Sequence, residues 1–185
     1  MLTEDARRLC QLFAEVLGYP GPSLARSAVE CARQLDASFP GSAEPMRAFV
    51  AFAEGQKLPE LQEIYTQTFD ITPETTPYVG YHLFGETPKR SVFMAKLQEA
   101  YQSHQLSTGT ELPDHLCVLM KFLSVARDKE TVIPLLEEGI LPILEKMEQA
   151  FHKDKNSYGL GIRSLRLFLA EISRKLTTSG GMRHG

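Results

Sequence analysis

The 185-residue chain has no tryptophan, only three cysteines and no apolar run long enough to cross a bilayer, which takes about 20 residues. Cys10, Cys31 and Cys117 are odd in number, widely spaced and form no C-x-x-C pair, so a disulfide framework and a cysteine zinc site are both disfavoured. The acidic start, Met1 to Asp5, lacks the basic and apolar regions of a secretory signal. We therefore expect a cytoplasmic protein with reduced cysteines and no membrane insertion.

Excess positive charge is also missing. The chain has 20 Lys and Arg against 23 Asp and Glu, a formal net charge of −3, which argues against a nucleic-acid binder. Apolar residues make up 43% and charged residues 23%, as in ordinary globular proteins. Length and composition predict a single domain over residues 1–176, with a disordered tail over 177–185.

Helical spacing of apolar residues recurs along the chain, whereas strand alternation is almost absent. Leu9, Phe13 and Leu17, for example, share one helix face after a possible N-cap at Thr3. A kink or a break is expected after Gly139, because Pro142 removes a helical hydrogen bond. We predict an all-α bundle of about eight or nine helices, at about residues 3–17, 24–39, 45–53, 58–69, 78–84, 89–103, from 113, 130–151 and 157–176.

Aromatic residues surround residues 70–77, where two prolines and three threonines predict an extended loop. Tyr65, Phe69 and Phe93 are best interpreted as core beneath this loop. Tyr78, Tyr81 and Phe84 are also suited to line a partly exposed apolar groove that accepts an amphipathic helix or an apolar peptide.

Charge is unevenly distributed along the chain. Residues 58–115 contain eight acidic and three basic residues, a net charge of −5, whereas residues 152–185 carry a net charge of +5. A solvated helix face accounts for the basic end. An acidic rim beside an apolar groove would attract a basic, apolar peptide.

The most concentrated polar segment is Glu111-Leu112-Pro113-Asp114-His115, and three interpretations of it stand side by side. In the structural one, Pro113 and Asp114 begin a helix and His115 bonds to a neighbouring loop. In the recognition one, the carboxylates accept forked hydrogen bonds from a partner's arginine. In the catalytic one, His115 and a carboxylate form an acid–base pair. Signatures of phosphate loops, dinucleotide sites, zinc proteases and serine hydrolases are absent.

The central third of the chain resembles a known family. The segments that carry the likeness are Tyr65-Thr66-Gln67-Thr68-Phe69-Asp70, the loop through Pro77-Tyr78, Gly85-Glu86, the helix with Arg90, Phe93-Met94, Leu97 and Tyr101, and Glu111-Leu112-Pro113-Asp114-His115-Leu116. This pattern resembles the nitrate reductase assembly chaperones, the NarJ branch of the NarJ/TorD/DmsD redox-enzyme maturation proteins. The resemblance is strongest over residues 58–125.

The resemblance implies an all-α, non-catalytic cytoplasmic chaperone. Such a protein binds the N-terminal peptide of a molybdenum-containing oxidoreductase subunit, often a twin-arginine signal or its remnant, and holds the apoenzyme until the molybdenum cofactor is inserted. It implies no metal ion or cofactor of the chain's own. It assigns peptide binding to Glu111, Asp114 and His115, with Tyr65, Phe69 and Asp70 as further candidates.

The residues themselves suggest how such a peptide would bind. Its apolar face would lie on Tyr78, Tyr81 and Phe84, and its arginines would reach Asp70, Glu111 or Asp114. Two other functions stay open at this point. One is a metal-dependent helical hydrolase that uses Asp114 and His115, and the other is a helical adaptor for a folded partner.

Overall fold

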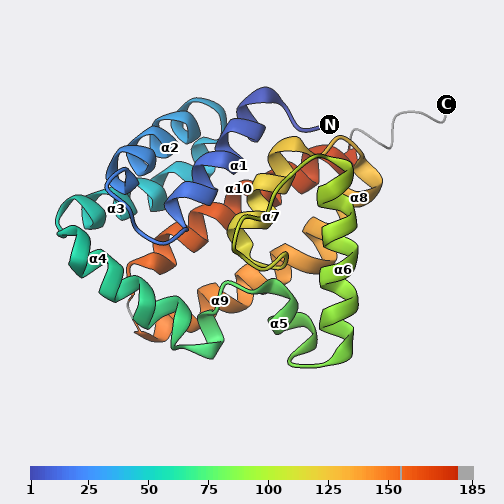
Figure 1. The fold of residues 1–185 in the computed structure, drawn as a ribbon. Coiled ribbons are helices and arrows are strands. Elements are labelled where there is room, and N and C mark those ends of the chain that lie inside the picture. Colours follow the sequence, from blue (N-terminus) through green and yellow to red (C-terminus); the bar gives the residue numbers. More distant parts are fainter. Residues whose placement is uncertain (155, 179–185) are drawn as a thin grey trace.

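The computed structural model describes residues 1–154 and 156–178, without the side chains of residues 152–154, and it confirms the all-α fold (Figure 1). Within these residues the chain forms ten α-helical segments. A π-helical turn joins α8 to α9 without a break, so these ten segments form nine separate helices. The segments are α1 (Glu4–Val16), α2 (Leu24–Ser38), α3 (Ala43–Glu54), α4 (Leu58–Tyr65), α5 (Val79–Phe84), α6 (Pro88–Ser103), α7 (Leu116–Val125), α8 (Lys129–Pro134), α9 (Leu141–Asp154) and α10 (Tyr158–Thr178).

Helix α1 shows how the sequence pattern becomes packing. The Thr3 hydroxyl accepts a hydrogen bond from the Ala6 amide (3.2 Å), which caps the helix as predicted. The apolar face of α1 packs against α2 and α7. The Arg7 guanidinium donates to the carbonyls of Ser124 (2.8 Å) and Ala126 (2.9 Å), and so satisfies acceptors that the end of α7 leaves free.

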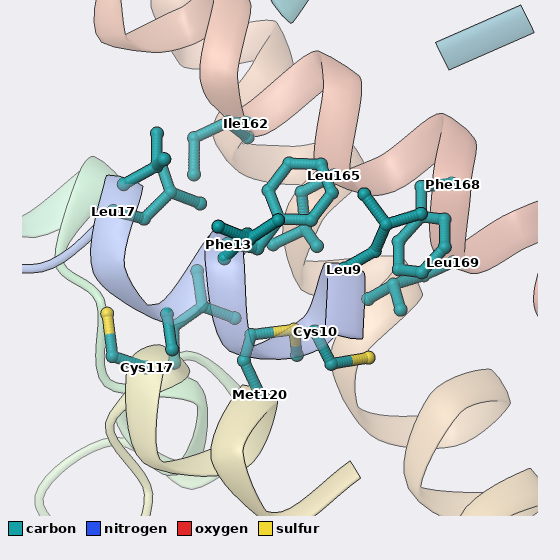
Figure 2. Close-up of a cluster of buried hydrophobic side chains, with 14 of the residues drawn as sticks. Leu9, Cys10, Phe13, Leu17, Cys117, Met120, Ile162, Leu165, Phe168 and Leu169 are labelled. Carbon is teal, nitrogen blue, oxygen red and sulfur yellow. The ribbon is translucent and has the colours of Figure 1, made fainter. Parts of the chain in front are cut away.

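One part of the core lies on the two sides of α1, which packs between α7 and α10 (Figure 2). Leu9 and Phe13 are fully buried, and the ring of Phe13 stacks on that of Phe168 from α10 with centroids 5.5 Å apart. Each such side chain contributes about 1.5–3 kcal/mol relative to exposure, so the packing on both faces of α1 adds substantially to the stability of the bundle.

A second aromatic cluster sits where α4 meets α10. Tyr65 and Phe69 are 3% and 2% exposed, and their rings lie 5.6 Å and 5.2 Å from that of Tyr158. The helix predicted to reach Phe69 ends at Tyr65 and continues as a π-helical turn over Thr66–Asp70. The loop that follows contains a 3-10 turn, Pro73–Thr75, so it is less extended than predicted.

Helix ends were predicted less accurately than helices. Ser23 is a residue type that often caps helices and it precedes α2, but its side chain makes no capping bond. Pro134 is the last residue of α8. The chain does not break near Gly139, and the irregularity expected there is the π-helical turn Leu135–Ile140 just before Pro142. Helix α10 extends to Thr178, two residues into the predicted tail, and residues 179–185 lie outside the described residues.

None of the described helices is both long enough and apolar enough to cross a membrane.

The three cysteines provide a test of the packing. All three are buried, and burial raises the pKa of the Cys10 and Cys117 thiols to about 12 and that of Cys31 above its usual range. Because the thiolate is the reactive form, we expect a disulfide reagent to modify the native thiols at least about a hundredfold more slowly than those of the unfolded chain. The absorbance of the thiolate that the reagent releases measures the reaction rate of the native protein and that of the unfolded chain. Rapid reaction of even one thiol in the native protein would contradict this packing.

Candidate functional site

An isolated antiparallel bridge joins the segment before α5 to the segment before α7. The Val79 amide donates to the Asp114 carbonyl (2.9 Å), and the Leu116 amide donates to the Pro77 carbonyl (2.8 Å). We call residues 77–79 and 111–116 the corner. These backbone bonds fix the starts of two helices that lie far apart in the sequence.

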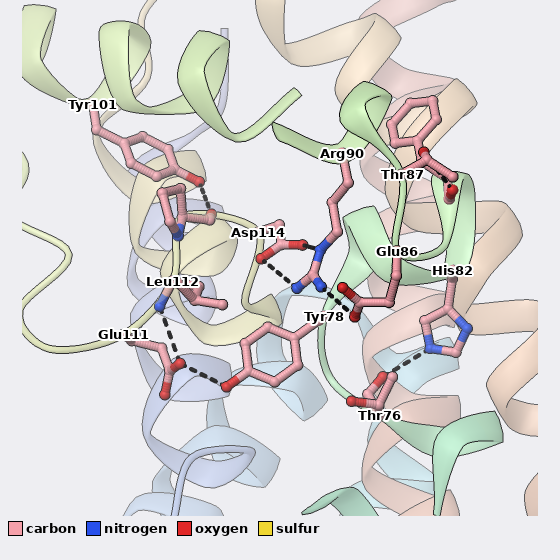
Figure 3. A network of polar contacts seen from close by, with 12 residues as sticks. Thr76, Tyr78, His82, Glu86, Thr87, Arg90, Tyr101, Glu111, Leu112 and Asp114 are labelled. Carbon is pink, nitrogen blue, oxygen red and sulfur yellow. Dashed lines mark hydrogen bonds and ion pairs between the residues drawn. The ribbon is translucent and has the colours of Figure 1, made fainter. Parts of the chain in front are cut away.

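A buried ion pair lies behind the corner (Figure 3). Asp114 is completely buried, and the Arg90 guanidinium from α6 reaches it with Nε 2.9 Å from Oδ2 and Nη2 3.4 Å from Oδ1. The hydrogen bond that Arg90 donates to Asp114 raises the pKa of Arg90 above its usual value. Glu86 accepts a third bond from Arg90 Nη1 (3.1 Å). The forked pair therefore ties α6 to the corner, with both charges compensated inside the protein.

Close packing surrounds this ion pair. The Arg90 guanidinium carbon lies 5.6 Å from the ring centroid of Tyr78 and 5.9 Å from that of Tyr81, within the range of cation–π attraction. Gly80 leaves the necessary space, because a Cβ there would stand 2.6 Å from Asp114 Oδ2. The glycine thus allows α5 to approach the buried carboxylate directly.

Glu111 holds the outer side of the corner. Its Oε1 accepts hydrogen bonds from the Tyr78 hydroxyl (2.8 Å) and the Leu112 amide (3.1 Å). Burial, together with the Glu111 bond, raises the pKa of Tyr78. The other oxygen, Oε2, lies 3.9 Å from His115 Nε2, and the Glu111 side chain is 41% exposed. Glu111 is therefore a partly exposed carboxylate at the edge of the corner.

His115 acts as the N-cap of α7 rather than binding a neighbouring loop. Its Nδ1 accepts a hydrogen bond from the Cys117 amide (3.1 Å), which requires that nitrogen to be unprotonated. Burial lowers the pKa of His115, against the opposing effect of Glu111 and Asp114. Helix α7 consequently starts at Leu116, so the expectation that Pro113 and Asp114 lie in its first turn was wrong.

The catalytic interpretation of this segment gains no support from the geometry. Arg90 binds the Asp114 carboxylate, and the Cys117 amide binds His115 Nδ1. The other carboxylate, Glu111, has its Oε2 3.9 Å from His115 Nε2, beyond hydrogen-bond distance, so neither carboxylate is hydrogen-bonded to the imidazole as an acid–base pair requires. Among the residues that the structure describes, no group of three or more His, Cys, Asp or Glu side chains is placed to hold a metal ion.

A groove of about 360 Å³ opens beside the corner. Asp70 and Glu86 are exposed on its rim, Tyr78 and Tyr81 are half-buried in its wall, and Ile71 is 69% exposed. We call it the acidic groove. Its lining residues are Asp70, Ile71, Thr72, Pro73, Thr76, Tyr78, Tyr81, Glu86, Arg90 and Leu112.

The structure brings some of the predicted site residues together and separates others. Asp70, Tyr78 and Tyr81 line the acidic groove, and Glu111 adjoins it through its bond to Tyr78. Asp114 and His115 lie behind the groove, 0% and 6% exposed.

Three predicted site residues lie elsewhere. Tyr65 and Phe69 are in the aromatic core, which contradicts direct contact with a peptide, because large aromatic side chains at helical spacing are buried for packing. Phe84 faces away from the acidic groove and packs on Phe93, with ring centroids 5.5 Å apart.

Sequence reasoning also missed residues of the groove. Arg90, Glu86, Ile71 and Leu112 all line it. The spacing of Glu86 and Arg90, four positions apart, was a visible signal for an ion pair, but nothing in the sequence showed that Arg90 also reaches Asp114.

A double-mutant cycle tests the coupling between Arg90 and Asp114. Asp114→Ala removes the buried partner of the largely buried Arg90 and leaves it only the exposed Glu86, so we expect it to lower the free energy of unfolding by about 3–5 kcal/mol. The double variant Arg90→Met/Asp114→Ala should lose clearly less than the sum of the two single losses. Urea denaturation measures all four proteins.

Glu86→Gln serves as the matched control for this cycle, because it removes the exposed partner of the same arginine and should cost less than about 1 kcal/mol. Additive losses in the double variant would show that Arg90 and Asp114 do not stabilise each other.

His115 should make stability depend on pH. Its native pKa lies below the unfolded value, so as pH falls from about 7.5 to about 5 the unfolded chain gains a proton that the native state resists, and stability is lost. His115→Asn keeps a capping acceptor without titrating, and should reduce this loss by up to about 1.4 kcal/mol per pH unit. Parallel stability curves for the two proteins, from urea denaturation at each pH, would contradict a neutral native His115.

Comparison with known proteins bears on the same region. The chain matches the family model described as nitrate reductase delta subunit over residues 33–158. It is 39% identical over 67 residues to the nitrate reductase molybdenum cofactor assembly chaperone NarJ of Bacillus subtilis, and this matched stretch covers 36% of each chain. It is 28% identical over 102 residues to NarJ of Escherichia coli, which covers 55% of this chain and 42% of that one. The match thus spans less than half the length of either relative.

A solved structure shares the fold. The redox enzyme maturation protein from Archaeoglobus fulgidus superimposes with a TM-score of 0.61 and 20% sequence identity, over 89% of this chain and 93% of that chain. The family match contains the corner and the acidic groove, and it confirms the resemblance noted in the sequence. The chain therefore belongs to the nitrate reductase delta subunit family.

Proposed function

We propose that this protein is an assembly chaperone that binds the N-terminal peptide of a nitrate-reductase-like molybdenum oxidoreductase subunit and holds the apoenzyme until its cofactor is inserted. The observation that carries the proposal is the acidic groove, in which exposed carboxylates surround tyrosine rings and exposed apolar side chains. The family match and the chaperone names of both relatives support it.

The groove suits a peptide with both apolar and basic side chains. Ile71 and Leu112 are 69% and 45% exposed, and with Tyr81 they offer an apolar surface that a bound peptide would desolvate. Asp70 and Glu86 are exposed on the rim and would attract arginines, including the pair of a twin-arginine signal where the client keeps one. Apolar contact supplies most of the affinity, and the carboxylates fix the orientation of the peptide.

The Glu111–His115 segment then has a divided role. The Glu111 carboxylate contacts the peptide, because that side chain is 41% exposed beside the groove. Asp114 and His115 position the groove from behind, because Arg90 and the α7 helix cap already use their polar atoms. A client arginine would reach Asp114 only by displacing Arg90.

A chaperone of this kind holds its client without chemical turnover. Ordering a flexible tail in the groove costs conformational entropy, which limits the affinity and permits release once assembly is complete. The molybdenum cofactor is then cargo for the client rather than a group resident in this chain.

Peptide titration tests the proposal. We expect a synthetic N-terminal peptide of the host's nitrate-reductase-type large subunit to bind with a Kd of about 1 µM or lower by calorimetry, which corresponds to about −8 kcal/mol. Ile71→Ala and Asp70→Lys should each weaken binding roughly tenfold while changing the melting temperature little, because both side chains line the groove and are exposed.

Glu54→Lys is the matched control, because it makes the same charge change at the exposed end of α3 and should leave binding unchanged. A peptide with its arginines replaced by glutamine should bind as weakly to the wild type as the native peptide binds to Asp70→Lys. Absence of heat with every peptide tried, or equal weakening by Glu54→Lys, would contradict the proposal.

A further inference from the structure

Helix α6 is unusually poorly covered. Of its 16 residues only Leu97 and Tyr101, both near its C-terminal end, are buried. It lies at the edge of the molecule, and α5 is the helix on which it chiefly packs (Figure 1). The N-terminal half of α6 thus presents a face that no element of the described chain covers.

That face borders a second groove, of about 380 Å³. The rings of Phe84 and Phe93 form an apolar wall, and Val92 is 56% exposed. Lys89 and Lys96 line the same groove and are exposed. No acidic residue lines it and it shares no lining residue with the acidic groove, so we call it the basic groove.

The spacing of these residues matches what a docked helix needs. Lys89, Val92, Phe93 and Lys96 stand at positions i, i+3, i+4 and i+7, so they share one face of α6. An amphipathic helix laid along α6 would place its apolar residues on Val92 and Phe93 and its flanks beside the two lysines.

We propose that the basic groove docks an amphipathic helix with acidic flanks that belongs to a protein partner. Charge complementarity selects this occupant, because lysines border an apolar floor and no carboxylate in the groove neutralises them. The hairpin of α5 and α6 then separates two grooves of opposite charge, the acidic groove for a basic tail and the basic groove for an acidic helix.

Two other occupants fit less well. In a symmetric dimer through this face, Lys89 and Lys96 of both copies would be brought together, and like charges facing one another are destabilising. A flat anionic bilayer could contact the lysines but could not fill a concave groove of about 380 Å³.

The proposal can be tested on the full chain with a designed probe. The probe is a fluorescent peptide of about 18 residues, with leucines at helical i, i+3, i+4 and i+7 spacing and glutamates on both flanks. We expect saturable binding by fluorescence anisotropy at physiological salt. A second peptide, with lysines in place of the glutamates, should bind roughly tenfold more weakly.

Charge reversal locates the site. Lys89→Glu/Lys96→Glu changes two exposed positions, should keep the helical circular dichroism, and should weaken binding of the acidic peptide roughly tenfold while strengthening binding of the lysine peptide. Arg8→Glu/Arg26→Glu is the matched control, with the same charge change at exposed positions of α1 and α2. Asp70→Lys, in the acidic groove, should not reduce binding of the acidic peptide, which keeps this test separate from that of the proposed function.

The proposal is overturned if the acidic peptide does not bind at about 1 mM, which corresponds to about −4 kcal/mol, or if the control pair weakens binding as much as the lysine pair. Sedimentation that shows a dimer sensitive to Lys89→Glu/Lys96→Glu would assign the groove to a second copy. Binding to anionic vesicles without peptide binding would assign it to a membrane. Either outcome contradicts the proposal.

Discussion

The buried pair of Arg90 and Asp114 is the interaction on which the candidate site depends. It joins α6 to the corner at a point where Asp114 has no access to solvent, and Gly80 allows α5 to approach the same carboxylate. A buried charge without its partner is far more costly than the pair is favourable, so the three segments are constrained to stay together. The arginine also lies against Tyr78 and Tyr81, and this fixes the aromatic wall of the acidic groove.

This constraint explains how the Glu111–His115 segment can contribute to binding although Asp114 and His115 are buried. The polar atoms of Asp114 and His115 are used in the ion pair with Arg90 and in the cap of α7. These two residues therefore affect a partner only indirectly, by fixing the shape of the acidic groove. The surface chemistry comes from their neighbours, with Asp70, Glu86 and Glu111 as acceptors and Ile71, Leu112 and Tyr81 as apolar contacts. A rigid wall with exposed carboxylates suits a protein that holds a tail without changing it.

The sequence predicted the helices well, because apolar residues at helical spacing report directly on burial; Leu9, Phe13 and Leu17 are all in the core. It predicted caps less well, since His115 is not among the usual capping residues and Ser23, which is, makes no capping bond. The groove was only partly predictable. Asp70, Tyr78 and Tyr81 line it, but the pairing of Arg90 with Asp114 depends on how α6 packs against the corner, which no local pattern encodes.

The most direct test is to map a bound client peptide on the protein by NMR. With isotope-labelled protein and the N-terminal peptide of the client subunit, the account predicts that the largest backbone shift changes fall within the segments 70–81 and 86–90 and at Leu112, which contain the residues that line the acidic groove. It also predicts little change in α1, α2 and α3, which form none of its walls. Shift changes confined to those three helices, with the residues around Arg90 and Asp114 unmoved, would contradict the account.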